Sequence, residues 1–298
     1  MCESINWENI IPNFQKGDIV APFENTFQEQ EKADFILDGG MEHRSILRTY
    51  ASVRRKDTQK EGVYSQSGEQ ILPEDFDQCN VIIYNSGDFY VAAIEARNGK
   101  LYGLYNRLGQ QIVPVQFLSV QIQDYMVIVR NEDRLYGAYS LNGKEIISCN
   151  YDVISFSGSL DQGCGSAIVR KNSMYGVISE SGEQIVPLQY GPIFRNAQNG
   201  KGYIIHDAKN HKLCGWYSSD GKNSIPCQFE KLKFYSDKIQ VTIPNLLHGI
   251  YSYVGKELVP PIFKEIHYLG NYIVGLIGKD DLSIYDQNGN FLYNTVKK

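Results

Sequence analysis

The sequence predicts an all-β fold made of tandem copies of one short antiparallel module. Three observations support this prediction: glycines recur at a fixed spacing, apolar and polar residues alternate around them, and the 298 residues include 21 tyrosines and 27 glycines. Tyrosine suits a half-buried pleated surface, and glycine provides the positive φ angles of tight turns. No segment shows the spacing of apolar residues that an amphipathic helix requires.

Each copy of the repeat is marked by a residue that we define as offset zero, which is glycine in every copy except the last. These residues are Gly62, Gly103, Gly137, Gly176, Gly215, Gly249 and Ser283. A second glycine follows at offset six: Gly68, Gly109, Gly143, Gly182, Gly221, Gly255 and Gly289. Tyrosine stands at offset two, except where Ile178 replaces it, and proline stands at offset eleven in five copies. The six complete copies carry an aromatic residue at offset fourteen: Phe76, Phe117, Tyr151, Tyr190, Phe229 and Phe263. This regularity identifies a tandem repeat.

The offsets predict the elements of a module in order. Residues around offset zero, such as 102–106, alternate in polarity and predict a strand. A small polar residue at offset three, such as Asn106, starts a turn, and the glycine at offset six takes the left-handed conformation of a hairpin loop. The returning strand carries paired aliphatic residues, such as Ile112 and Val113. We expect the proline to end this strand, because proline cannot donate to the ladder.

Two further elements complete each module. The aromatic residue behind the proline is expected in the core, where it is shielded from water. A closing strand is expected before the next copy begins. These strands are predicted at 50–53, 89–94, 126–129, 167–169, 203–205, 239–243 and 272–277. Three or four short strands per module, joined by short connections, predict an antiparallel meander.

The chain divides into an N-terminal region, residues 1–60, and a repeat array, residues 61–298, which we expect to be continuous with it as one domain. The N-terminal region is expected to hold one degenerate copy, in which the segment from Gly17 to Pro22 reproduces the interval from offset six to offset eleven and Ile11 takes offset zero. The rest of this region is interpreted as an insertion. Segments 79–88, 156–166 and 191–202 vary in length between copies, so we expect irregular loops there and place any specific binding site in them.

The string from Tyr102 to Pro114, YGLYNRLGQQIVP, followed by Phe117, resembles the WG-repeat (KWG-type) family of bacterial tandem β-repeat proteins. The resemblance extends over roughly residues 61–293. It implies a repeat scaffold without a recognised catalytic centre. One departure concerns the tryptophan that precedes the first glycine in that family. Its positions here are occupied by Glu61, Tyr102, Tyr136, Tyr175, Cys214 and His248.

Two arrangements of the modules agree with these patterns. In a β-propeller-like ring each copy is one blade, and we favour this arrangement because closure protects the edges of the sheets. In the alternative, an open superhelical β-hairpin solenoid, neighbouring copies stack and the atypical end copies act as caps.

Few residues suggest chemistry. Arg54, Arg55 and Lys56 lie in the densest basic stretch and are candidates for binding an anion, although basic residues also protect edge strands from pairing. His206, Asp207 and His211 lie close together in the sequence and could bind a metal, but polar residues are also expected in the turn that they occupy.

Cys164, between two glycines, has no histidine nearby to act as a base. The tyrosines at offset two could line a ligand groove or pack in the core. We therefore expect no catalytic residues, no metal site and no cofactor.

The function predicted from these features is that of a non-catalytic interaction module whose loops bind another macromolecule, with protein as the favoured partner. A net charge of −5 provides no general attraction to nucleic acid or to anionic membranes, so neither is expected as a partner. We expect a cytoplasmic protein, because the sequence shows no signal peptide and no apolar run of roughly 18 residues. A carbohydrate or cell-surface binding protein and a propeller-type hydrolase are the alternatives.

Overall fold

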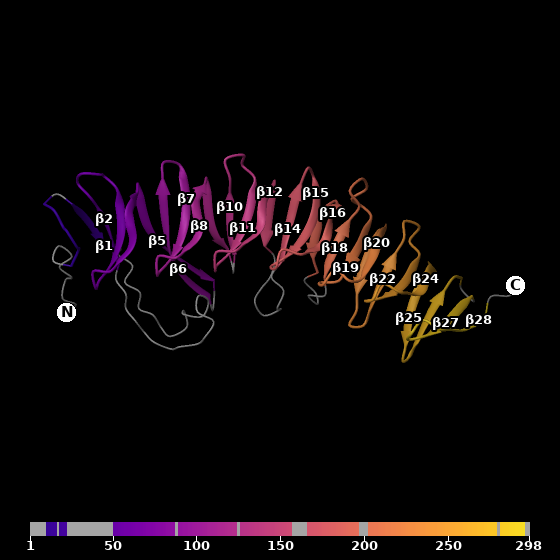
Figure 1. Cartoon of the computed structure of the whole chain (residues 1–298). Coiled ribbons are helices and arrows are strands. Elements are labelled where there is room, and N and C mark those ends of the chain that lie inside the picture. Colours follow the sequence, from indigo (N-terminus) through magenta and orange to yellow (C-terminus); the bar gives the residue numbers. More distant parts are fainter. Residues whose placement is uncertain are drawn as a thin grey trace. The chain divides into compact units, whose positions relative to one another are not determined.

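The computed structural model describes residues 10–16, 18–22, 50–86, 89–123, 126–156, 166–196, 202–278 and 281–295. These residues form seven four-stranded antiparallel sheets, numbered 1 to 7 from the N-terminus, and the strands of each sheet pair in chain order (Figure 1). The predicted all-β fold of tandem antiparallel modules is confirmed. Among the described residues, no helix is long and apolar enough to span a membrane.

The strands have the following bounds. Sheet 1 contains β1 (Ile19–Pro22), β2 (Tyr50–Arg54), β3 (Glu61–Ser65) and β4 (Gln70–Phe76). Sheet 2 contains β5 (Gln78–Ser86), β6 (Phe89–Asn98), β7 (Leu101–Asn106) and β8 (Gln111–Phe117). Sheet 3 contains β9 (Ser119–Gln123), β10 (Met126–Arg130), β11 (Tyr136–Ser140) and β12 (Glu145–Tyr151). Sheet 4 contains β13 (Val153–Phe156), β14 (Ser166–Lys171), β15 (Met174–Ser179) and β16 (Gln184–Tyr190). Sheet 5 contains β17 (Ile193–Arg195), β18 (Tyr203–His206), β19 (Cys214–Tyr217) and β20 (Ser224–Phe229). Sheet 6 contains β21 (Lys231–Phe234), β22 (Lys238–Thr242), β23 (His248–Ser252) and β24 (Glu257–Phe263). Sheet 7 contains β25 (Glu265–Leu269), β26 (Tyr272–Leu276), β27 (Leu282–Asp286) and β28 (Phe291–Asn294).

The chain forms two compact units, Met1–Ile154 (unit 1) and Ser155–Lys298 (unit 2). Unit 1 holds sheets 1 to 3, unit 2 holds most of sheet 4 and all of sheets 5 to 7, and the boundary falls within β13. Sheet 1 combines β1 and β2, which precede residue 60, with β3 and β4, which follow it. The predicted arrangement of all copies in a ring stays a prediction.

The glycines at offset six form the predicted hairpin turns. All seven have positive φ angles, from 73° at Gly221 to 90° at Gly182. In the turn between β7 and β8, the Gly109 N–H donates to the carbonyl oxygen of Asn106 at 3.0 Å. The Asn106 side chain accepts hydrogen bonds from the N–H groups of Leu108 and Gln110, both at 2.9 Å. A polar residue at offset three and a left-handed glycine at offset six therefore close each turn.

The same glycines also set the distance between neighbouring sheets of a unit. A Cβ atom on Gly109 would lie 2.1 Å from the carbonyl oxygen of Ile71 in the preceding sheet, and one on Gly221 would lie 2.5 Å from that of Ile185. No side chain fits at these distances. Glycine at offset six therefore serves two purposes, the turn and the close approach of one sheet to the next.

The prediction that proline ends the returning strand is wrong. β8 continues through Pro114 to Phe117. Its pairing with β7 moves from Leu104↔Val113 to Tyr102↔Phe117, so four residue steps in β8 oppose two in β7, which is a β-bulge. β8 is the last strand of its sheet, and proline is tolerated on an edge strand at a bulge because no ladder donor is needed there.

The bulge explains the glycine at offset zero. A Cβ atom on Gly103 would lie 2.7 Å from the backbone nitrogen of Val115, because the bulged strand crosses over this residue. The last copy carries Ser283 instead, and its partner strand has no bulge at this point, since Ser283 pairs with Asn294 and Ile284 with Tyr293 in regular register. Glycine at offset zero is therefore needed where the neighbouring strand is bulged.

The apolar clusters form between neighbouring sheets within each unit. The rings of Phe229 and Phe263 at offset fourteen are fully buried, and those of Phe76 and Phe117 are nearly so, whereas Tyr151 and Tyr190 are half-buried. Each contacts the tyrosine at offset two of the following copy edge-to-face where both lie in one unit. The centroid distances are 5.7 Å for Phe76–Tyr105, 5.8 Å for Phe117–Tyr139, 5.8 Å for Tyr190–Tyr217, 5.5 Å for Phe229–Tyr251 and 6.1 Å for Phe263–Tyr285. Packing is thus the role of these tyrosines in the structure.

The degenerate first copy exists in another register than predicted. Pro22 lies in β1, which pairs with β2 as the first strand of sheet 1, whereas the other repeat prolines lie in fourth strands. Ile10 takes the place of offset nine instead, because the Gly68 turn approaches its carbonyl oxygen as the Gly109 turn approaches that of Ile71. Ile11 is buried at the place of offset ten. Residues 10–16, which we call the N-terminal cap, form no strand of their own. Their apolar side chains pack on sheet 1 at the places that the fourth strand of a preceding copy would hold.

The segment 79–88 is also not an irregular loop. Its first eight residues belong to β5, which pairs with β6 over nine residues, from Gln78↔Arg97 to Ser86↔Phe89. The extra length of this module is therefore a longer hairpin. The prediction of an irregular loop at 191–202 is also wrong in part, because this segment contains strand β17 (Ile193–Arg195). Residues 197–201 of this segment and residues 157–165 of the predicted loop 156–166 lie outside the described residues.

Candidate functional site

The basic residues Arg54 and Arg55 are paired with carboxylates. The Arg54 Nε–H donates to Glu61 Oε1 at 3.0 Å, and the other carboxylate oxygen of Glu61 accepts a hydrogen bond from the Cys79 N–H at 2.8 Å. Lys56 is exposed, and its backbone N–H donates to Asp18 Oδ1 at 3.0 Å. An anion at this place would compete with the protein's own carboxylates, so anion binding there stays a prediction.

Arg55 connects the N-terminal cap to sheet 1. Its guanidinium donates to Asp18 at 3.0 Å, to Glu74 Oε1 at 2.6 Å through Nη2, and to the carbonyl oxygen of Pro12 at 3.0 Å. Burial raises the pKa of Asp18, but hydrogen bonds from the Gln15 and Lys56 N–H groups and from Arg55 outweigh burial and leave this pKa below its ordinary value.

Burial likewise raises the pKa of Glu74, whereas hydrogen bonds from the Tyr64 hydroxyl and Arg55 lower it, and the pKa is lowered overall. Burial and the hydrogen bond to Glu74 raise the pKa of Tyr64 to about 12. These groups form a structural clamp between the cap and sheet 1.

The turn at 206–211 shows the local interactions of a polar turn. Asp207 Oδ1 accepts hydrogen bonds from the N–H groups of Lys209 and Asn210 at 2.9 and 2.7 Å. His206 Nδ1 lies 3.0 Å from the carbonyl oxygen of Pro192, and His211 is exposed. Within the described ranges, no three histidine, cysteine or acidic side chains come together as metal ligands.

The cysteines that the structure describes are Cys79, Cys149, Cys214 and Cys227, and all four are free thiols. Burial raises the pKa of Cys79 and of Cys227 to about 12 and that of Cys214 to about 11. A thiol with so high a pKa is not a nucleophile at neutral pH. Cys164, the other cysteine considered above, lies outside the described residues.

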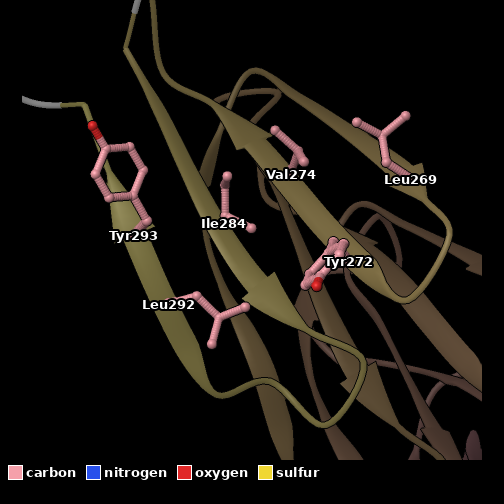
Figure 2. Close-up of a pocket in the computed structure, with 6 residues that line it drawn as sticks. All are labelled: Leu269, Tyr272, Val274, Ile284, Leu292 and Tyr293. Atoms are coloured by element: carbon pink, nitrogen blue, oxygen red, sulfur yellow. The ribbon is translucent and has the colours of Figure 1, made fainter.

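The most distinctive surface is an apolar face at the C-terminal end of unit 2. Sheet 7 presents six side chains on one side, from four strands, and they line a shallow pocket of about 290 Å³ (Figure 2). We call this surface the terminal face. Its residues are Leu269, Tyr272, Val274, Ile284, Leu292 and Tyr293. Leu269 is 62% exposed and Tyr293 57% exposed, so large apolar groups face solvent.

The equivalent side of the other sheets is buried. The residues at offset ten are at most 3% exposed in the six complete copies: Leu72, Val113, Ile147, Val186, Ile225 and Val259. Tyr293 holds offset ten in the last copy. The residues at offset one show the same contrast, because Leu104 and Ile250 are fully buried and Ile284 is half-buried. The terminal face is therefore a stacking surface of the repeat that no described residue covers.

Sequence reasoning missed this face, although a signal was present. The last copy is incomplete, yet it keeps apolar residues at offsets one, nine and ten: Ile284, Leu292 and Tyr293. These are the positions that a following copy would bury. Apolar residues at these offsets that no described residue covers form an exposed apolar surface.

Comparisons with known proteins agree with the repeat. The family described as WG containing repeat matches residues 136–174. No curated protein matches the sequence. Solved structures align over most of the chain at low identity. BamB from Moraxella catarrhalis is 11% identical over 94% of this chain and 92% of that chain, with a TM-score of 0.26.

Hsv2 from Kluyveromyces lactis is 11% identical over 81% and 87% of the two chains, with a TM-score of 0.27. The computationally designed Ika8 protein is 12% identical over 89% and 90%, with a TM-score of 0.25. Scores this low carry no argument about function. The family match does bear on the fold: the chain carries a WG containing repeat at residues 136–174, from β11 to the first residue of β15, as its sequence predicted.

Proposed function

We propose that this chain is a non-catalytic scaffold that binds protein, and that the terminal face is its binding surface. The observation that carries the proposal is the exposure of Tyr293 at offset ten, a position that is buried in the six complete copies, together with the exposure of Leu269, Tyr272 and Leu292 beside it. Exposed apolar patches of this kind are typical of surfaces that bind other proteins. The proposal moves the binding surface from the predicted loops to the face of a sheet.

The chemistry of the face favours protein over carbohydrate. A sugar site needs several polar groups that fix the hydroxyls, whereas the side chains lining this pocket are aliphatic apart from two tyrosines. A protein surface with apolar side chains can match such a face. The absence of catalysis is part of the proposal, and it is supported by the paired state of Asp18, Glu61 and Glu74 described above.

The test is site-specific photo-crosslinking of the full chain. A benzophenone amino acid at position 269 should capture a discrete protein in extracts of cells that produce the chain. The same group at position 246 is the matched control, because Leu246 is 70% exposed in the same unit but lies outside the face. The substitution Leu292→Lys should abolish the capture from position 269. Equal capture from both positions, or none from position 269, would contradict the proposal.

A further inference from the structure

We propose that the terminal face binds the terminal face of a second copy of this chain and so forms a closed dimer. This inference rests on the proposed function, since it names the partner of the same surface. It depends on three observations: what covers the equivalent faces of other sheets, which faces a second copy can offer, and the charge of the residues involved.

Inside each unit, the side of a sheet that corresponds to the terminal face is covered by another sheet. Sheet 7 covers sheet 6 in this way, with Ile250, Val259 and Phe263 packed against Ile273 and Tyr285. The backbone at Gly275 lies against the Phe263 ring so closely that a Cβ atom would be 2.5 Å from it. Five such clusters occur between described neighbouring sheets, three in unit 2 and two in unit 1. Within each unit, this kind of face is therefore covered by the apolar face of a neighbouring sheet.

The N-terminal cap covers the face of sheet 1 that it packs on, so a second copy cannot use that face to bind the terminal face. Ile11 is 4% exposed and packs with Ala51, Val53 and Tyr64. Arg55 holds the cap in place through the carbonyl oxygens of Pro12 and Asn13. Stacking of copies head to tail is therefore blocked by the chain itself. The terminal face of the second copy stays available, and an interface between two identical faces closes at two chains.

The charge of the terminal face also permits it to bind the same face of a second copy. None of its six residues is charged, so the apolar centres of two such faces meet without like-charge repulsion. Glu265 and His267, whose side chains lie 3.1 Å apart, are on the same side of β25 as Leu269 but do not line the pocket. Four strands about 4.8 Å apart, three of five residues and one of four with about 3.3 Å per residue, give a face of roughly 14 by 17 Å. This is smaller than a standard interface of about 800 Å² per partner, so we expect a dissociation constant on the order of 10 μM or weaker.

Sedimentation analysis of the purified full chain over a concentration series tests the inference. We expect monomer and dimer, and no larger species, up to roughly 500 μM. Leu292→Lys places a charge on each of the two facing surfaces and should raise the dissociation constant at least about tenfold. Leu246→Lys, at an exposed position of the same unit, should leave the dissociation constant unchanged, and circular dichroism should show that both variants are folded.

Three results would overturn the inference: a wild-type chain that stays monomeric, a dimer that Leu292→Lys does not weaken, or a series of species beyond the dimer. A monomeric chain that still crosslinks a different protein from position 269 would leave the proposed function standing and remove only the second copy as its partner. A monomeric chain that crosslinks nothing would remove both.

Discussion

At the scale of single residues, one aromatic ring per module supplies much of the contact between neighbouring sheets. Phe229 is fully buried and contacts Tyr251 of the next sheet, with Trp216 in the same cluster. A ring in this position loses all contact with water and adds an edge-to-face contact. Its removal would leave a cavity that the two sheets cannot close, because the Gly255 turn already touches the backbone of Ser224.

We therefore expect Phe229→Ala to reduce the free energy of unfolding of unit 2 by about 3–5 kcal/mol. Phe194→Ala is the matched control in the same unit, because Phe194 is 57% exposed and should cost less than about 1 kcal/mol. Urea denaturation followed by circular dichroism measures both. Similar losses for the two variants would show that the ring at offset fourteen is not the main contact.

The clamp at Arg55 makes the free energy of unfolding of unit 1 dependent on pH. The pKa values of Asp18 and Glu74 are lower in the folded chain than their ordinary values near 4. The folded state therefore binds fewer protons than the unfolded state, and the stabilisation is present above about pH 4 and is lost as the pH falls through the lowered pKa values.

We expect the midpoint of urea denaturation of unit 1 to fall more steeply below about pH 4 for the wild type than for Asp18→Asn or Glu74→Gln. Each substitution removes one group that must be protonated, so the variant's curve should be flatter although its stability at pH 7 is lower. Asp57→Asn, at an exposed position beside the clamp, is the control and should follow the wild-type curve. Parallel curves for all four chains would mean that the clamp does not contribute.

At the scale of the element, each hairpin turn is also a spacer between sheets. Gly109 has a φ of 77° and leaves no room for a Cβ atom against the carbonyl oxygen of Ile71. Gly99 also has a positive φ, 58°, but apart from its two chain neighbours no residue has an atom within 4 Å of the place where its Cβ would be. Substitutions at the two glycines therefore distinguish the free-energy cost of the positive φ angle from the free-energy cost of the steric clash.

Gly99→Ala should lower the free energy of unfolding by about 1 kcal/mol, the cost of a left-handed alanine. Gly109→Ala should cost a further 1–3 kcal/mol or so, because the backbone of the neighbouring sheet must move away. Thermal denaturation of the two variants measures the difference. Equal losses would show that the close approach of the two sheets is not needed for stability.

The sequence predicted the turns and the closing strands because local chemistry determines them. A polar residue at offset three and a glycine at offset six suffice to close a hairpin, and alternation from Met126 to Val129 suffices to show a strand. The continuation of the strand beyond Pro114 was not predicted, because proline is equally compatible with a strand end and with a bulge at an edge. The glycine at offset zero gave the missing signal, since a bulge that crosses it excludes a side chain.

At the scale of the whole molecule, the two ends of the repeat array differ. The first copy was predicted but placed in the wrong register. In the cap, Pro12 holds the place of offset eleven, and the aromatic residue Phe14 follows it more closely than in the complete copies. The terminal face could have been predicted only by asking which residues bury offsets one, nine and ten of the last copy. A repeat needs capping at both ends to avoid association, and only the first end has a cap among the described residues.

This difference between the ends predicts a change of assembly when the cap is loosened. Ile11→Asp places a carboxylate among Ala51, Val53 and Tyr64, where a charge is unfavourable, and should release the cap from sheet 1. Sheet 1 then presents the kind of face that sheet 7 presents to sheet 6, and the terminal face of another copy can bind it head to tail. Because such an interface does not close, we expect species larger than a dimer, which sedimentation velocity can resolve.

The double variant Ile11→Asp with Leu292→Lys distinguishes this assembly from aggregation of unfolded chains. It keeps the loosened cap but carries a charge on the terminal face, so it should stay monomeric if the larger species form through that face. Aggregation caused by unfolding of unit 1 would persist in the double variant, because Leu292 lies in unit 2. Larger species that resist Leu292→Lys, or an Ile11→Asp chain that forms none, would show that the cap does not limit assembly at the first end.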